Sequence, residues 1–135
     1  MTTAIHDGWI ELLLRYPWDW KMDLTTRHPQ SPERLQKACE RLHRILTRCA
    51  QTGVDAFFAL EQSACGRWHI HALVGCDRPL NPKLLRTAWK AGFTEIQRIT
   101  CVRSAVWYAT KSASTSTEHL LLLLSRRSRR RFDAK

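Results

Sequence analysis

The stretch that decides the fold of this chain is WHIHALV, residues 68–74. His69 and His71 stand two positions apart in an otherwise apolar run, and residues i and i+2 of a β-strand point to the same face of a sheet. A strand here presents two imidazoles side by side and packs its apolar residues on the other face. Two neutral imidazoles on a rigid strand are half of a divalent metal site.

A third metal ligand follows from the strand that we expect over residues 54–62, which is rich in aromatic and apolar residues. The short turn after it contains Gly66. A hairpin centred in this turn places Glu61 opposite His69 and diagonal to His71, because cross-strand neighbours share a face. Glu61, His69 and His71 are the predicted metal ligands, although a register slip of one residue would turn Glu61 to the other face. The alternative is an incidental pair, with one histidine in the core and one in solvent.

A second pattern lies in SAVWYATK, residues 104–111. This stretch predicts the start of a helix with Ser104 as its N-cap. Tyr108 and Lys111 are three positions apart and therefore share a helix face. A phenol beside an ammonium is a candidate catalytic pair, because the positive charge stabilises the charge that develops when the phenol attacks phosphorus. The alternative is an interfacial tyrosine next to a solvated lysine.

A His-hydrophobic-His strand followed by a helix with Tyr-x-x-Lys resembles the HUH endonucleases, specifically the single-tyrosine rolling-circle replication initiators. Residues 69–71 and 108–111 carry the resemblance, and residues 18–26 are a looser match to the family's upstream threonine motif. The three motifs come in the family's order. The resemblance implies that Tyr108 attacks a phosphodiester, leaving a covalent 5′-phosphotyrosine and a free 3′-hydroxyl, with Lys111 beside it.

The resemblance also implies a cofactor and partners. The cofactor is one Mg²⁺ or Mn²⁺, although imidazole ligands by themselves are equally compatible with Zn²⁺. The partner is single-stranded DNA at a replication origin. Because the sequence has no Gly-x-x-x-x-Gly-Lys phosphate loop, unwinding and extension would fall to a host helicase and polymerase. Two rivals are a single-tyrosine HUH transposase and a non-catalytic basic module that binds single strands by charge and stacking.

Four further residues are predicted DNA contacts. Thr25 and Thr26 end the first strand, where their hydroxyls either reach a phosphate or cap a turn. Arg67 and Trp68 precede the two histidines and offer a charge and an aromatic ring. The chain has six tryptophans, and such rings either stack on unpaired bases or pack in the core.

The composition suits one compact domain, since 44% of the 135 residues are hydrophobic. A net charge of +10 favours a polyanionic partner, with nucleic acid first and an anionic membrane surface second. Five cysteines without a Cys-x-x-Cys indicate neither a disulfide framework nor a cysteine-rich zinc site. With no recognisable signal peptide or membrane span, we expect a cytoplasmic protein, or one in the DNA-containing compartment of its host. Its oligomeric state is left open.

Periodicity and capping residues predict the order β-α-β-β-α-β, which is an α+β, ferredoxin-like core with an antiparallel sheet, followed by the tyrosine helix. The predicted strands cover 18–26, 54–62, 68–76 and 93–102; the helices run from Pro32 to a stop at Gly53 and from Pro82 to about Ala91. Residues 10–14 fit a short helix or a strand. We assign 1–112 to an endonuclease domain and 113–135 to a polar linker, a short leucine-rich helix and a basic tail.

The first predicted helix has one apolar stripe and, largely on its other side, a row of cations. A basic helix face of this kind is usually solvated, and we expect it to add only non-specific attraction to DNA. The cations are Arg34, Lys37, Arg41, Arg44 and Arg48.

Overall fold

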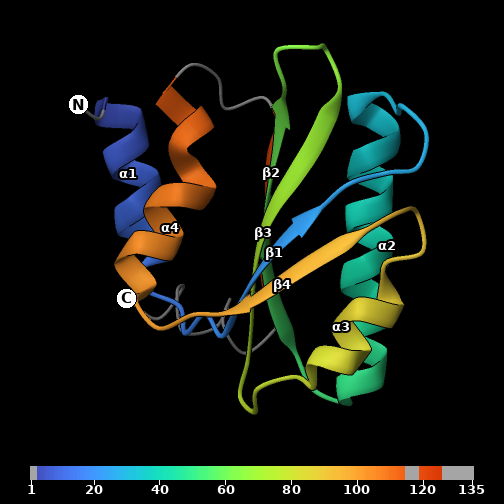
Figure 1. The fold of residues 1–135 in the computed structure, drawn as a ribbon. Helices are drawn as coiled ribbons and strands as arrows, with labels where there is room; N and C mark the ends of the chain where they lie inside the picture. The colour runs from blue at the N-terminus through green and yellow to red at the C-terminus, as the bar shows by residue number, and fades with distance from the viewer. Residues whose placement is uncertain (1–2, 115–118, 126–135) are drawn as a thin grey trace.

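The computed structural model describes residues 3–114 and 119–125, and it has a five-stranded sheet between two layers of helices (Figure 1). Each element forms where the sequence supplies a cap, a turn or an alternating apolar pattern. In chain order the elements are α1 (Ala4–Leu13), β1 (Trp20–Leu24), α2 (Pro32–Ala50), β2 (Val54–Gln62), β3 (Trp68–Cys76), α3 (Pro82–Ala88), β4 (Thr94–Arg98), α4 (Val102–Thr110), the 3₁₀ helix η1 (Lys111–Ser114) and β5 (Leu120–Leu123).

The strand order is β4-β1-β3-β2-β5, and all neighbours are antiparallel. The units β1-α2-β2 and β3-α3-β4 are each split by one antiparallel strand, which is the ferredoxin-like arrangement. The α+β fold predicted from the sequence is therefore confirmed. Ahead of this core lies α1, so the stretch 10–14 belongs to a helix.

The sheet separates two apolar cores, because successive side chains of each strand point to opposite faces. From β3, Ile70, Ala72 and Val74 enter the core beneath α2 and α3. Leu73 enters the other core, which contacts α1 and α4. Since His69 and His71 share the parity of Leu73, both imidazoles face the layer of α1 and α4.

Two predicted boundaries move because other segments bond to the ends of these elements. The second predicted helix stops at Ala88 rather than Ala91, since the Trp89 indole donates to the Thr25 carbonyl and the Arg27 amide donates to the Ala91 carbonyl. The outer strand β4 covers only 94–98, because its partner β1 is equally short.

Two predicted helix ends also differ from the structure. The tyrosine helix begins at Val102 with Cys101 as its cap, so the prediction of Ser104 as N-cap is wrong. The Ser104 hydroxyl donates instead to the Cys101 sulfur. Helix α2 ends at Ala50, and Gln51 adopts the left-handed conformation that ends it. Gly53 has a different role, since a Cβ there would lie 2.3 Å from the Ser125 Cβ.

The leucine-rich stretch forms β5, so the prediction of a short helix there is wrong. This strand pairs with the outer edge of β2, with Leu121 opposite Phe58. Alternate leucines then pack against each of the two cores. Sheet pairing prevails because five successive leucines have no periodicity that distinguishes helix from strand. The division at residue 112 stays a prediction, and the basic tail lies outside the described residues.

All five cysteines are free thiols, in agreement with the absence of a disulfide pattern. Within the described ranges, no helix has both the length and the apolar character needed to cross a membrane.

Helix α1 holds the tyrosine helix through a buried hydrogen bond. His6 Nε2 lies 2.8 Å from the Thr110 hydroxyl, and both side chains are almost fully buried. The Thr110 hydroxyl donates to the Val106 carbonyl at 2.7 Å, so it accepts from the His6 N–H. This contact joins two helices that lie 104 residues apart in the sequence.

Replacing His6 with alanine should lower the free energy of unfolding by about 1–3 kcal/mol, because the Thr110 hydroxyl loses a buried partner and a void remains. Urea denaturation followed by circular dichroism measures the change. Ile5→Ala is the control, since Ile5 is 59% exposed on the same helix. Equal losses for the two variants would contradict a specific role for the His6–Thr110 contact.

Candidate active site

Strand register brings the predicted metal ligands together. Glu61 on β2 lies directly opposite His69 on β3, and Ala59 lies opposite His71, so the predicted hairpin register is confirmed. Gly66 supplies the turn with a φ of 90°, a value that favours glycine. One ligand atom from each of Glu61, His69 and His71 lies within 4.8 Å of the other two.

Two of these ligand atoms are buried without a hydrogen bond to any described residue, namely His71 Nε2 and Glu61 Oε2. They lie 3.1 Å apart, but they do not have the geometry of a hydrogen bond to each other. Adjacent ligands of an octahedral Mg²⁺ or Mn²⁺ stand about 3 Å apart, since metal–ligand bonds are about 2.1 Å long. Two imidazoles and a carboxylate therefore fit a divalent ion, in donor type and in the spacing of this pair.

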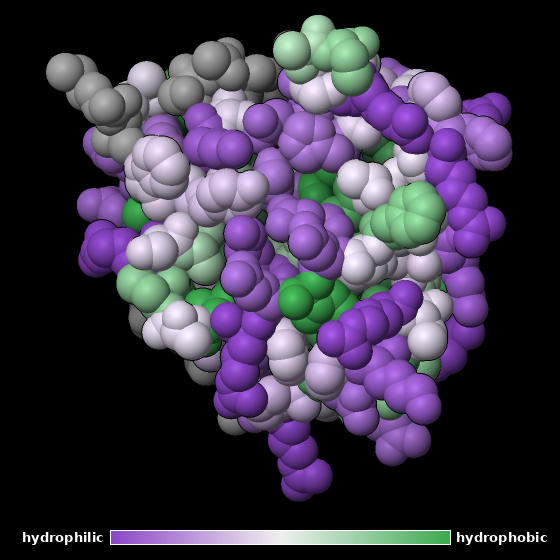
Figure 2. All heavy atoms as spheres, viewed as in Figure 1, coloured by the Kyte–Doolittle hydropathy of each residue, from purple (hydrophilic) through white to green (hydrophobic). Residues whose placement is uncertain are grey.

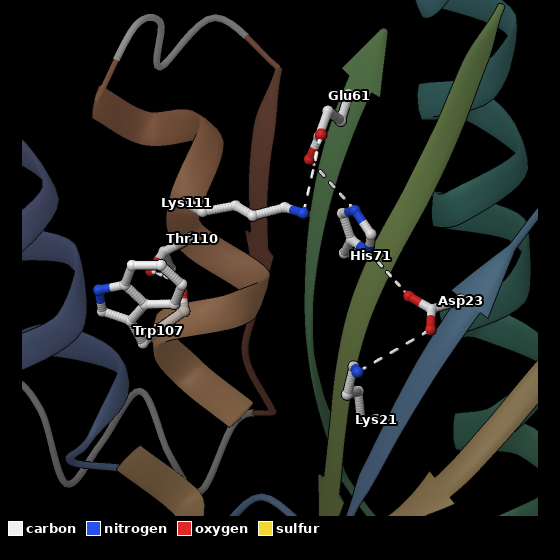
Figure 3. Close-up of polar contacts among 7 residues, drawn as sticks. All are labelled: Lys21, Asp23, Glu61, His71, Trp107, Thr110 and Lys111. Carbon is white, nitrogen blue, oxygen red and sulfur yellow. Dashed lines mark hydrogen bonds and ion pairs between the residues drawn. The ribbon is translucent and has the colours of Figure 1, made fainter. Parts of the chain in front are cut away.

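The second nitrogen of His71 is fixed by Asp23 on β1, which lies opposite it in the sheet. His71 Nδ1 is 2.7 Å from Asp23 Oδ1. A carboxylate can only accept, so Nδ1 carries the proton and the Nε2 lone pair is turned toward Glu61. Figure 3 shows His71 between these two carboxylates.

The environment favours the charge states that metal binding requires. Burial lowers the pKa of His69, and the neighbouring His71 lowers it further, which keeps the imidazole neutral. Burial acts to raise the pKa of Asp23, but the hydrogen bond from His71 and nearby positive charges outweigh it. The pKa of Asp23 therefore lies below its ordinary value, and the residue remains an acceptor for His71.

Helix α4 places Tyr108 directly against this cluster. The rings of Tyr108 and His71 have centroids 5.0 Å apart and stand nearly perpendicular. The ammonium of Lys21 is 3.7 Å from the Tyr108 ring centroid, and that of Lys111 is 4.5 Å from it. The phenol ring therefore contacts two cations, one from β1 and one from the end of its own helix.

Each of these cations also faces a carboxylate of the site (Figure 3). Lys21 Nζ is 4.0 Å from Asp23 Oδ2, and Lys111 Nζ is 3.9 Å from Glu61 Oε1. Both lysine side chains are less than half exposed. The site thus alternates positive and negative groups, which suits a phosphodiester approached by a metal ion and a phenol.

A hollow of about 420 Å³ opens beside Tyr108, between the end of β4 and the start of α4. Lys21 and Arg98 supply positive charge to its lining, and Ser104 supplies a hydroxyl. The hollow is large enough to admit part of a nucleotide next to the tyrosine.

The predicted DNA contacts lie outside this cluster. The buried Thr26 hydroxyl donates to the His28 carbonyl, so it caps a turn, which was one of its two predicted roles. Thr25 is exposed beside it. Arg67 is exposed at the start of β3, and its guanidinium donates to the Thr26 carbonyl. Trp68 packs against the core beneath α2 and edge-on to the His119 ring, on the face opposite the two histidines.

Sequence reasoning missed Lys21 and Asp23 as members of the site. Their signal was the alternation of β1, in which Trp20, Met22 and Leu24 are the buried residues. The polar positions between them point to the layer of α4, but their partner His71 lies 48 residues further on. Nothing local to β1 indicates which strand its polar face will meet.

The fold and the site define an α+β protein with a candidate divalent-metal cluster beside a helical tyrosine. The chain belongs to the replication-associated protein ORF2 family, whose model matches residues 19–117. That range includes all the residues of the cluster, as well as Tyr108 and Lys111.

The fold is also similar to a crystal structure of the hypothetical protein ORF119 from Sulfolobus islandicus rod-shaped virus 1. The TM-score is 0.57 at 14% sequence identity, over 81% of this chain and 94% of that chain. At this identity the likeness supports the fold alone. No match was found among curated proteins.

Replacing Asp23 with asparagine should weaken Mn²⁺ binding by about 10–100-fold, because His71 loses the acceptor that orients its ring. Isothermal titration calorimetry with MnCl₂ measures the affinity. Glu95→Gln is the matched control, since Glu95 lies opposite Asp23 on the neighbouring strand and is exposed. If both variants lost affinity equally, the effect would be one of overall charge rather than of His71 orientation.

Proposed function

We propose that this protein cuts and rejoins single-stranded DNA through Tyr108, as an HUH-type endonuclease that initiates rolling-circle replication. The observation that carries the proposal is the contact of the Tyr108 ring with His71, one of the three clustered metal ligands. Membership in a replication-associated family supports the setting. The DNA partner would be a single-stranded origin segment, opened by a host helicase and extended by a host polymerase.

The cluster supplies the requirements of a phosphodiester cut. Glu61, His69 and His71 would hold one Mg²⁺ or Mn²⁺, which when bound polarises a phosphate oxygen and offsets the charge of the transition state. Asp23 keeps His71 in the tautomer that leaves Nε2 free to ligate. Lys21 and Lys111 place positive charge next to the phenol, where the phosphate must approach.

The reaction is a transesterification. The Tyr108 oxygen forms a bond to phosphorus and loses its proton to solvent, while the bond from phosphorus to the 3′ oxygen breaks. The departing oxygen takes up a proton and becomes the free 3′-hydroxyl. Because the phosphotyrosine ester retains the bond energy, attack by a 3′-hydroxyl rejoins the strand and releases Tyr108 without a further energy source.

Tyr108→Phe should abolish formation of a covalent protein–DNA adduct, because the attacking oxygen is removed. Labelled single-stranded oligonucleotides from the protein's own replicon are incubated with MnCl₂ and run on a denaturing gel. EDTA should also abolish the adduct. Tyr16→Phe is the matched control, since Tyr16 is the other of the two tyrosines and is buried in the core.

Two results would refute the proposal. Adduct formation by Tyr108→Phe would show that another residue is the nucleophile. Binding of every oligonucleotide without any adduct would instead identify a non-catalytic single-strand-binding module. Excision of the ends of a mobile element would favour the transposase alternative.

Lys21→Ala should slow adduct formation by about 10–100-fold, because one positive charge next to the phenol and phosphate is lost. Single-turnover kinetics with saturating MnCl₂ measure the rate. Arg103→Ala removes an equal charge from α4, five positions before Tyr108 and so on a different side of that helix. Equal slowing by both variants would contradict a local role for Lys21.

A further inference from the structure

A row of five cations runs along the exposed side of α2. Their spacings alternate between three and four residues, so successive side chains follow one line on the helix surface. The line extends for about 21 Å, since fourteen residues separate its ends and each adds 1.5 Å. The cationic row consists of Arg34, Lys37, Arg41, Arg44 and Arg48.

All five residues of the cationic row are exposed, and none of their side chains has an ion pair with a described residue. Figure 2 shows a column of hydrophilic residues at the margin where Figure 1 places α2. The helix also carries Glu33 and Glu40, but Glu40 accepts a hydrogen bond from Gln36 on the helix itself. The row is therefore a fixed line of unneutralised positive charge on a rigid element.

A groove follows the upper part of the row. One hollow of about 340 Å³ is lined by Thr26, Arg34, Lys37 and Arg41. A smaller one continues along Arg41 to Lys90, between α2 and the end of α3. Since the Arg67 guanidinium donates to the Thr26 carbonyl, positive charge continues around the end of β1 to the start of β3.

We propose that the cationic row binds the phosphate backbone of double-stranded DNA that flanks the single-stranded segment cut at Tyr108. Its length matches about six base-pair steps of a duplex, at 3.4 Å each. The row lies on the opposite side of the sheet from Tyr108, so it contacts a different part of the DNA from the cut site. The position of the cut strand rests on the proposed function; binding of a duplex by α2 does not.

Charge and surface chemistry favour a duplex over other polyanions. Sites for single strands combine cations with aromatic rings on which bases stack. The one ring of the groove, Trp89, is buried and donates its N–H to the Thr25 carbonyl. Insertion into a membrane surface requires an exposed apolar face, but Leu35, Leu42 and Leu46 of α2 are buried in the core. Cations without stacking surfaces suit a backbone whose bases are already paired.

The test measures DNA binding by the full chain in EDTA, so that no strand is cut. The probes are a hairpin with a single-stranded tail and the same tail without the hairpin, both labelled, with a stem of about twelve base pairs to span the row twice. The test variant combines Arg34→Gln, Lys37→Gln and Arg41→Gln. Its matched control combines Arg78→Gln, Lys83→Gln and Arg86→Gln, which removes equal charge from exposed positions in and just before α3.

The row variant should bind the hairpin probe roughly tenfold or more weakly than the unmodified chain, and the slope of log affinity against log salt should fall by about 2.7, or 0.9 for each lost phosphate contact. Its affinity for the tail alone should stay within about twofold, since the row is not in contact with the single strand. The control variant should lose little affinity for either probe. Circular dichroism and thermal unfolding establish that both variants remain folded.

Several outcomes would overturn the proposal. Equal losses for the row and control variants would show that net charge alone governs binding. Equal losses on both probes would show that the row binds the single strand. Competition by anionic lipid vesicles that disappears only in the row variant would assign the row to a membrane surface. Because no chemistry takes place in EDTA, absence of cutting at Tyr108 would leave these binding results intact and would refute the proposed function separately.

Discussion

The register of β3 between β1 and β2 is the constraint on which the rest of this structure depends. It places His71 opposite Asp23 on one side and next to Glu61 on the other. A slip of one residue at either boundary would send a carboxylate to the opposite face and leave a buried imidazole without its acceptor. The same register is held by apolar residues of β3, such as Ile70 and Leu73, which are fully buried. Core packing and site geometry therefore depend on a single alignment.

The alternation of β3 also explains why the two helix layers differ in chemistry. Its odd-numbered residues bring two imidazoles toward α4, and α4 meets them with Tyr108 and Lys111. Its even-numbered residues are apolar and pack beneath α2. Since α2 uses its apolar stripe entirely for this core, its outer side is left to cations. In our proposals the first layer supplies chemistry, and the second supplies attraction to flanking DNA.

Much of the fold and part of the site were predictable because their signals are local. The glycine turn and the two alternating strands around it are contiguous, so the pairing of Glu61 with His69 follows from a hairpin of few possible registers. The caps Ser31 and Asn81 begin α2 and α3 as expected. By contrast, the leucine stretch 120–124 is apolar at every position, and only the open edge of β2 decides that it becomes a strand.

By itself, the sequence determined the order of the ferredoxin-like elements, the metal-ligand triad and the tyrosine helix, because each is encoded by periodicity or spacing within a few residues. Only the tertiary structure decided that Asp23 orients His71, that Lys21 and Lys111 flank the Tyr108 ring, and that α1 holds α4 through His6. These contacts join segments separated by tens of residues. They depend on which strands and helices become neighbours, and a periodic pattern carries no information about the element that it will meet.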